Sequence, residues 1–484
     1  MPIVEMGSTM EVRYLFELVQ IETTGRAETY VLKNEIDASA TMQAAPAWAA
    51  STVYEKWEVV RTGGSIYQCK QAHTSGASFE SDNWILVRAE VPLYSNASTY
   101  AVGDVVRYPT TTPDGVYQCK VEITAGEEWN SAKWVKIANL GSTMPNGYVG
   151  VCSTSGAAFI GTLDGGGYTI RHLYQWSNTT EQHGLFGYLG ENGVVRNLYF
   201  ANGCLYRFGT GGITGTTGLV AANFVTPSFK PITIQNVHAI DCLLQGGNRV
   251  GSFVGEANSC FRISIQECSS NAIVKSNSSF VTGAFVGGLV GSGVVGYKPY
   301  GTGIKRCLFN GSLYGNSSTK AHVGGLYGGF SATTSAICAE DCIFSGSITG
   351  SVVKAGGIAA TALSQDGNYY IKACLNTGTI SLAAGTKYGI NENIGYVENC
   401  YYDTQTTGCT DRPTQQRTTE QMKKRSFLVG LDFDRIWYLP KSPVIASPFN
   451  GGYPIQRHWI DIQSSGVSGG SNMRGAASLL GFGL

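Results

Sequence analysis

The chain has 484 residues, a length that allows two to four domains and a large buried core. Its 34 Lys and Arg residues balance 34 Asp and Glu residues, with no long run of one sign, which argues against nucleic acid or an anionic membrane as a partner because both require a basic surface. The 63 glycines, with many Ser, Thr, Asn and Tyr residues, are typical of short strands and tight turns, so we predict an all-β class.

The start of the chain and its cysteines give expectations about location. The first six residues, MPIVEM, have neither the basic nor the apolar region of a secretory signal, so we predict none. No apolar run reaches the roughly 18 to 20 residues of a membrane span, so we predict no membrane insertion. The 13 cysteines form no C-x-x-C pair, and we interpret them as reduced thiols of a protein assembled in a cytoplasm.

Residues 1–45 are predicted to form an N-terminal cap and the first strands of a larger β-domain. The sequence VLKNEID at residues 31–37 and the sequence FIGTLD at residues 159–164 look like adjacent pieces of one repeat, although about 120 residues separate them. We therefore predict that residues 46–138 are an insertion, which a short loop could replace without unfolding the domain, since inserted domains bring their two ends together.

The insertion holds two short aromatic-rich units, predicted at residues 46–89 and 90–138. In both, two aromatic residues stand six apart and the sequence YQCK recurs, which indicates a duplication. A unit of this size must rely on stacked aromatic rings for its core. The predicted core aromatics are Trp48, Tyr54, Tyr67 and Trp84 in the first unit, and Tyr94, Tyr100, Tyr117 and Trp134 in the second.

These units resemble the small chitin-binding modules of bacterial chitinases, although Trp57 stands where that family has glycine. In the family a His-Thr pair and the next aromatic lie on the sugar-binding face. The second unit has Ile123 at the histidine position. A pyranose ring stacks its apolar face on such an aromatic ring, and two tethered modules raise affinity through effective concentration. The resemblance thus implies carbohydrate-binding residues His73, Thr74, Phe79, Thr124 and Trp129.

A degenerate repeat follows between about residues 184 and 400. Each copy has a Gly-apolar-Gly element and then a strand-like stretch that contains a cysteine, with a mean spacing of about 32 residues between the cysteines. This period fits one coil of a β-solenoid, in which equivalent side chains stack as ladders and the glycines allow positive-φ bends and close approach of coils. The predicted cysteine ladder is Cys242, Cys268, Cys307, Cys342, Cys374 and Cys400.

Together the G-L-x-G elements and cysteine strands resemble the GLUG repeats of bacterial adhesin-like proteins. The resemblance extends over residues 10–45 and 140–460, and includes the closing sequence NCYYDT at residues 399–404. It implies a right-handed parallel β-helix at residues 139–400 with a C-terminal cap at residues 401–460. The fold class predicted is therefore all-β, a right-handed parallel β-helix (solenoid) carrying two small inserted carbohydrate-binding modules.

Four carboxylates precede ladder cysteines and are the candidates for glycan cleavage: Asp241, Glu267, Asp341 and Glu398. Hydrolases place two carboxylates about 5 to 9.5 Å apart. Solvated polar residues at strand edges explain these four without a function, and we predict no catalytic residue. Asp164 is interpreted as a turn former. We find no motif for a metal or a cofactor and predict neither.

The sequence favours a non-enzymatic carbohydrate-binding adhesin that recognises a cell-surface polysaccharide or amino-sugar glycan. We expect a phage tail fibre or tail spike, released by lysis as part of a virion; the alternatives are a glycan depolymerase on a β-helix and a bacterial surface or biofilm adhesin. Residues 461–484 are Gly- and Ser-rich with an apolar end, which indicates a flexible tail that docks on other virion or tail proteins or is disordered. A homotrimer is one possible assembly.

Overall fold

The computed structural model describes residues 9–108, 114–141, 146–177, 182–207, 215–226, 230–258, 262–276, 283–294, 302–317, 319–331, 336–362, 369–392, 395–439 and 450–459. The described chain is all-β, as the sequence predicts. Four α-helices lie wholly within the described residues, and they have five residues or fewer: α1 (Leu15–Val19), α2 (Ile21–Thr24), α3 (Thr404–Thr407) and α4 (Thr419–Met422). Within these ranges, no helix is long and apolar enough to cross a membrane. The predicted tail at residues 461–484 lies outside the described residues.

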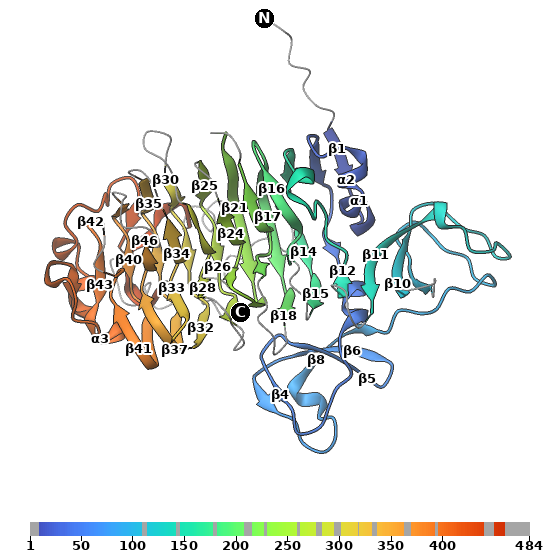
Figure 1. Cartoon of the computed structure of the whole chain (residues 1–484), viewed down its shortest axis with the longest axis horizontal. Coiled ribbons are helices and arrows are strands. Elements are labelled where there is room, and N and C mark those ends of the chain that lie inside the picture. The colour runs from blue at the N-terminus through green and yellow to red at the C-terminus, as the bar shows by residue number, and fades with distance from the viewer. Residues whose placement is uncertain are drawn as a thin grey trace, which may run out of the picture.

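Successive turns of the chain pass through three sheets, which we call sheets I, II and III, and stack along the long axis of the molecule (Figure 1). Sheet I is parallel throughout. Its strands are β1 (Thr9–Val12), β2 (Thr29–Leu32), β3 (Ile36–Asp37), β13 (Thr162–Asp164), β14 (Thr169–Arg171), β17 (Val194–Ala201), β21 (Ile232–Ile240), β25 (Ile263–Gln266), β26 (Ser269–Ser270), β30 (Thr302–Lys305), β31 (Leu308–Phe309), β35 (Ala336–Glu340), β36 (Ile343–Phe344), β39 (Tyr369–Lys372), β40 (Leu375–Asn376), β42 (Tyr396–Glu398), β43 (Tyr401–Asp403) and β44 (Gln416–Arg417).

Sheet II is parallel except at its N-terminal end, where the strands of the second aromatic unit and the next strand, Asn146–Tyr148, pair antiparallel as far as Tyr174–Ser177. Its strands are β9 (Val105–Tyr108), β10 (Asp114–Cys119), β11 (Trp134–Leu140), β12 (Asn146–Tyr148), β15 (Tyr174–Ser177), β18 (Cys204–Arg207), β19 (Thr216–Thr217), β22 (Leu243–Gly246), β23 (Arg249–Gly251), β27 (Ile273–Ser276), β28 (Ala284–Gly287), β32 (Ser312–Asn316), β33 (Ala321–Gly324), β37 (Ser347–Gly356) and β41 (Thr379–Tyr388). The parallel sheet III contains β16 (Phe186–Gly190), β20 (Ala221–Val225), β24 (Val254–Asn258), β29 (Val290–Val294), β34 (Tyr327–Ser331) and β38 (Ala359–Ala362).

Aliphatic ladders fill the space between the three sheets. In sheet I, Val195, Ile234, Ile265 and Ile304 are in register on four successive coils, and all four are fully buried. Burying each such side chain stabilises the fold by about 1.5–3 kcal/mol. This stacking of equivalent residues is the arrangement expected of a β-helix or solenoid, and we call the three sheets together the coil stack.

The cysteine ladder has five of the six predicted members. The backbone amide of Cys268 lies 3.4 Å from Cys307 Sγ, and that of Cys374 lies 3.3 Å from Cys400 Sγ. The pairing of β21 with β26 places Val237 opposite Cys268, so the prediction for Cys242 was wrong. Cys242 is buried at another bend, where its Sγ accepts a hydrogen bond from Gly203 N at 3.4 Å.

The glycines of the repeat serve close approach rather than positive-φ bends. A Cβ on Gly324 would lie 1.7 Å from Tyr327 O, and one on Gly287 would lie 1.8 Å from Val290 O. The positive φ angles occur instead at the residue before each position of the cysteine ladder. Asn and Asp adopt this backbone conformation more readily than other residues with a Cβ. These residues are Asn236, Glu267, Arg306, Asp341, Ala373 and Asn399.

The two segments that flank the aromatic units are neighbours in sheet I. Strand β2 pairs with β13, with Tyr30 opposite Leu163, and β3 pairs with β14. The second unit is nevertheless continuous with the coil stack, since β11 pairs with β12 and β12 with β15. Val116, Ile137 and Ala138 of this unit are buried in the main core. The predicted boundary at residue 138 lies inside β11, and this unit contributes buried side chains to the main core, so we now expect that replacing it by a short loop would expose part of that core.

The first unit lies against the outer face of sheet II, below β18 in Figure 1. It consists of β5 (Val59–Thr62), β6 (Ser65–Cys69) and β8 (Trp84–Ala89), with a second small sheet of β4 (Val53–Tyr54) and β7 (His73–Thr74). Its Trp57, Val59 and Ile66 form one buried cluster with Tyr174 and Leu243 of sheet II. The first unit is thus fixed to the coil stack by apolar packing.

The C-terminal segment differs from the predicted end cap. Strands β43 and β44 end the coil stack, but residues 418–439 and 450–459, which we call the strap, fold back along the outer face of sheet I. The strap contains β45 (Trp437–Tyr438) paired with β46 (Ile455–Gln456). It covers a register-matched ladder of Leu308, Ile343, Leu375 and Tyr401. The segment therefore covers a side of the stack as well as its end.

Candidate functional site

The first unit has a small core with a rim of aromatic rings. Tyr54 and Trp84 are buried with Val60 and Cys69, while the predicted core residues Trp48 and Tyr67 are only partly buried at the rim together with Phe79. The Phe79 ring stacks on Trp84 at 5.6 Å between centroids, lies 4.8 Å from the Tyr67 ring, and meets the Trp48 ring edge-on at 5.9 Å. Phe79 is therefore a supported, half-buried ring.

His73 and Thr74 lie beside this cluster on β7. His73 Nδ1 is 2.9 Å from Gln71 O, and because a carbonyl only accepts, Nδ1 carries the proton and donates. The His73 ring is half-buried and meets the Trp84 ring edge-on at 5.4 Å. Thr74 is exposed. The side chains of His73 and Phe79 thus both contact the Trp84 ring and belong to one aromatic cluster.

The second unit repeats this core with different side chains. Val106, Cys119, Ile123 and Trp134 are buried, and Ile123 fills the position of His73 with an apolar side chain. The predicted core residues Tyr94, Tyr100 and Tyr117 are partly buried around them. Ile123 therefore has a packing role and brings no polar group to the surface.

Thr124 and Glu127 form a polar pair on the second unit. Exposed Thr124 donates from Oγ1 to Glu127 Oε1 at 2.9 Å, and its backbone amide donates to the same oxygen at 2.8 Å. The Lys133 ammonium donates to Glu127 Oε2, and this bond, with those from Thr124, lowers the pKa of Glu127 to about 2. Thr124 is thus held in place beside a carboxylate that stays ionised.

Trp129 has stacking partners that the sequence did not indicate. Its indole lies parallel to the Tyr108 ring at 3.8 Å between centroids and stacks on Trp134 at 5.2 Å. The rings of Tyr94 and Tyr117 meet it edge-on. Trp129 is half-buried in this cluster rather than free-standing, and Tyr108 adds a further partly buried ring.

Sequence reasoning missed Tyr108. The signal was its place two residues after the Val105-Val106 pair, where the first unit has Thr62. The two units therefore differ in the rings available to a sugar: Phe79 in the first, and the Tyr108 and Trp129 pair in the second.

The glutamine of the YQCK sequence ties each unit to its surroundings. Gln68 Nε2 donates to Trp57 O at 3.0 Å and to Asn202 O of the coil stack at 3.1 Å. In the second unit, Gln118 Nε2 donates to Gly103 O at 2.9 Å, and Gln118 Oε1 accepts from Phe16 N of α1 at 2.9 Å. The repeated glutamine has a structural role at both attachments.

Trp57 occupies the backbone conformation of the family glycine. Its φ is 73°, and that of Gly103 at the same place in the second unit is 99°. The strained tryptophan is retained because its side chain, 9% exposed, packs between the first unit and Tyr174 of sheet II. This departure from the family is therefore an adaptation to the coil stack.

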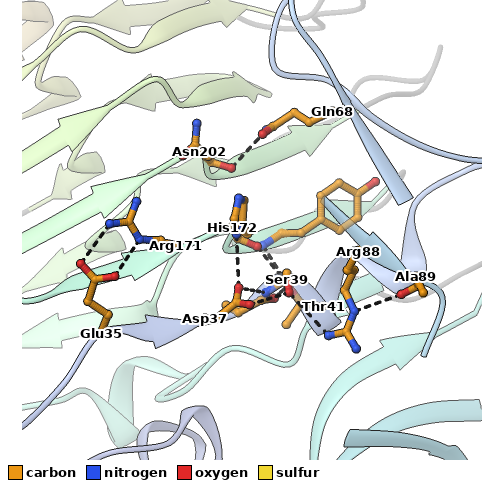
Figure 2. A network of polar contacts seen from close by, with 12 residues as sticks. Glu35, Asp37, Ser39, Thr41, Gln68, Arg88, Ala89, Arg171, His172 and Asn202 are labelled. Carbon is orange, nitrogen blue, oxygen red and sulfur yellow. Dashed lines mark hydrogen bonds and ion pairs between the residues drawn. The ribbon is translucent and has the colours of Figure 1, made fainter. Parts of the chain in front are cut away.

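A network of polar contacts completes the attachment of the first unit, as Figure 2 shows. Arg171 forms a two-pronged ion pair with Glu35, with both bonds at 3.0 Å. Asp37 accepts from Ser39 at 2.9 Å and contacts His172 Nδ1 at 3.2 Å. These groups join the first two coils to the start of the insertion, and their carboxylates are engaged in structural bonds.

The candidate carboxylates Glu267 and Asp341 make contacts with neighbouring coils and with the strap. Glu267 Oε1 lies 2.8 Å from Arg306 Nη2, and Arg306 stands on the coil between Glu267 and Asp341. Glu267 and Asp341 are therefore two coil spacings apart, which is about 9.6 Å. Burial raises the pKa of Asp341 to about 6, and the strap residue Trp437 donates its indole N–H to Asp341 at 3.3 Å. Asp341 is thus covered rather than open to a substrate.

The other candidates are also in structural contacts. Glu398 lies 3.8 Å from Lys372 Nζ. Asp241 is at a different bend from the other three, and its carboxylate accepts a hydrogen bond from Asn271 Nδ2 at 3.4 Å. Asp164 accepts from Gly166 N at 2.9 Å, as expected of a turn former. Among the described residues, no group of three or more His, Cys, Asp and Glu side chains could hold a metal ion.

Comparison with known proteins identifies the first unit. Residues 47–83 match carbohydrate-binding module family 5/12, which confirms the resemblance of this unit to a carbohydrate-binding module. The chain is also 34% identical over 110 residues to halomucin of Haloquadratum walsbyi. That stretch is 23% of this chain and 1% of halomucin, so the chain spans only a very small part of that relative.

One solved structure shows a limited likeness. The crystal structure of a putative immunoglobulin A1 protease from Bacteroides ovatus matches with a TM-score of 0.40 and 19% sequence identity. The match covers 64% of this chain and 81% of the other. A likeness of this size supports no conclusion about activity.

Proposed function

We propose that the protein is a non-enzymatic adhesin that binds carbohydrate at a cell surface or outside cells. The observation that carries this proposal is the match of residues 47–83 to a carbohydrate-binding module family. In the first unit, the binding residues are Phe79, His73 and Thr74, which lie at the rim of one aromatic cluster. In the second unit, Tyr108 and Trp129 take the place of Phe79, and exposed Thr124 lies nearby in sequence.

The binding mechanism is stacking of sugar rings on aromatic rings. A pyranose has an apolar face of C–H groups that packs on a phenyl, phenol or indole ring, while a hydroxyl such as that of Thr74 orients the sugar. A single ring gives weak binding. Two units attached to one scaffold bind a polymer more tightly, because the second contact forms at high effective concentration.

We propose that the scaffold is a right-handed parallel β-helix of the GLUG-repeat type. The three stacked parallel sheets and the close-packed glycines support this assignment. The attachments through Gln68, Gln118 and Trp57 hold both units rigidly at one end of the scaffold (Figure 1). A rigid scaffold suits an adhesin, since it presents both units to the same polymer.

We further propose a particle-borne form, a phage tail fibre or spike that attaches a virion to a host glycan. Free, buried thiols support it, because eleven described cysteines carry no disulfide and suit assembly in a reducing cytoplasm. The similarity to halomucin favours the alternative, a cellular surface adhesin. Contacts through residues 461–484 and a homotrimer belong to the particle-borne proposal.

A glycan array tests the proposal when product release is assayed on the best hit. The proposal predicts binding to at least one polysaccharide without new reducing ends or unsaturated uronates. Phe79→Ala should weaken that binding, and Tyr396→Ala is the matched control, because Tyr396 is a 55% exposed ring on β42 at the far end of the stack. Cleavage of the bound glycan, or equal loss of binding in both variants, would contradict it.

A further inference from the structure

A polar groove lies where the first unit meets the outer face of sheet II. Its volume is about 540 Å³, within the range of small-molecule sites. The lining residues are Glu55 of the first unit and Gln245, Ile273, Lys275, Ser276, Ser312, Tyr314, Asn316 and Thr349 of sheet II. None of them belongs to the aromatic rims of the two units.

The floor of the groove is a side-chain ladder on successive coils. Gln245 is in register with Lys275, Lys275 with Tyr314, and Tyr314 with Thr349. Neighbouring coils lie about 4.8 Å apart, so the floor offers a regularly spaced row of groups. Toward the N-terminus, the same ladder continues as Tyr206, which packs against the first unit. The groove therefore begins where that unit stops covering the ladder.

The chemistry of the lining suits an uncharged sugar. Amides from Gln245 and Asn316 and hydroxyls from Ser312 and Thr349 match sugar hydroxyls, and the half-buried ring of Tyr314 offers an apolar face. The one cation, Lys275, forms an ion pair with Glu55 and lies 5.2 Å over the Tyr314 ring. Because these two charges cancel, the lining has no net charge for an ionic ligand.

We propose that this groove is a second carbohydrate site, which binds a neutral oligosaccharide along the ladder from Gln245 to Thr349. The proposal rests on the proposed function, since it adds a second site for the same class of ligand on the coil stack. The ion pair between Glu55 and Lys275 joins the unit to the floor and fixes the groove walls. Tyr314 stacks on a sugar ring, and Asn316 and Ser312 orient it.

The test uses the full chain and calorimetric titration with chitohexaose, cellohexaose and mannohexaose as neutral probes and hexagalacturonate as an acidic probe. Ser312→Trp fills the groove with an indole. Its matched control is Thr379→Trp, because Thr379 is exposed on the same register ladder two coils further on and is not part of the lining. Both variants are compared alone and in a Phe79→Ala, Tyr108→Ala background.

The proposal predicts that the Phe79→Ala, Tyr108→Ala protein retains binding to a neutral probe. Adding Ser312→Trp should weaken the remaining affinity at least tenfold, whereas adding Thr379→Trp should leave it unchanged. Complete loss of binding in the double variant would overturn the groove site and leave the proposed function intact. Binding that neither the double variant nor Ser312→Trp reduces would overturn both, and a Ser312→Trp effect confined to hexagalacturonate would overturn the neutral ligand class.

Discussion

Replacing Trp57 by alanine and by glycine separates two energies at the attachment of the first unit. The indole is 9% exposed and packs against Val59, Ile66 and Tyr174, so Trp57→Ala should cost about 3–5 kcal/mol of local stability. The backbone has a φ of 73°, a conformation that costs a residue with a Cβ about 1–2 kcal/mol. Trp57→Gly removes the indole and this strain together.

The glycine variant should therefore be about 1–2 kcal/mol more stable than the alanine variant. This order is the reverse of that found inside regular strands and helices, where glycine is less stable than alanine by about 0.5–1 kcal/mol. Hydrogen exchange of the amides in β5, β6 and β8 measures both variants against the unchanged protein. An alanine variant as stable as the glycine variant would refute the conformational argument, and two variants that exchange like the unchanged protein would show that Trp57 does not anchor the unit.

Three further experiments test the site and the core. Tyr108→Ala should weaken glycan binding about tenfold and lower the melting temperature slightly, because one stack is lost. Trp129→Ala should lower affinity and reduce stability more, because its stacks on both Tyr108 and Trp134 are lost. Gly324→Ala should destabilise the coil stack by about 3 kcal/mol in denaturant unfolding, the upper end of the usual cost of overpacking, because its Cβ would collide with Tyr327 O. Gly156→Ala, with open space around it, should cost little. The pKa of Asp341 is raised to about 6, so in the folded protein this carboxyl keeps a proton that it releases near pH 3.8 in the unfolded chain. The contribution of Asp341 to the free energy of unfolding is therefore fully present below about pH 4 and is lost as the pH rises through 6. Asp341→Asn should remove that part of the pH dependence of the melting temperature, and an unchanged profile would contradict the assignment.

The coil architecture was predictable because glycine spacing and cysteine recurrence are local sequence patterns. The register of the strands between coils was harder to predict from the sequence. In several coils, two residues of sheet I have a positive φ and bend the chain. In one coil these are Asn236 and Asp241, and the residue after each of them is buried. In the sequence, Cys242 after Asp241 resembles Cys268 after Glu267. In the structure, however, Val237 is the residue opposite Cys268. Variable loop lengths conceal such a shift of five residues.

The binding residues show a similar division. Phe79 and Trp129 were predictable from the family pattern, but whether a ring is free depends on side chains from other strands. Tyr108 reaches Trp129 only after β9 pairs with β10, and no short motif records that contact. Trp57 is a departure from the family pattern whose reason lies in Tyr174, more than one hundred residues away in the chain. Tertiary packing of this kind leaves no local signal.

The most direct test of the carbohydrate-binding claim is the dissociation constant of the full chain for its best polysaccharide from the array, measured for the unchanged protein and for the Phe79→Ala, Tyr108→Ala variant. We predict that the double variant binds at least about tenfold more weakly, the loss expected when two partly exposed aromatic contacts are removed, while Tyr396→Ala binds like the unchanged protein. Equal affinity of the double variant and the unchanged protein would contradict the account.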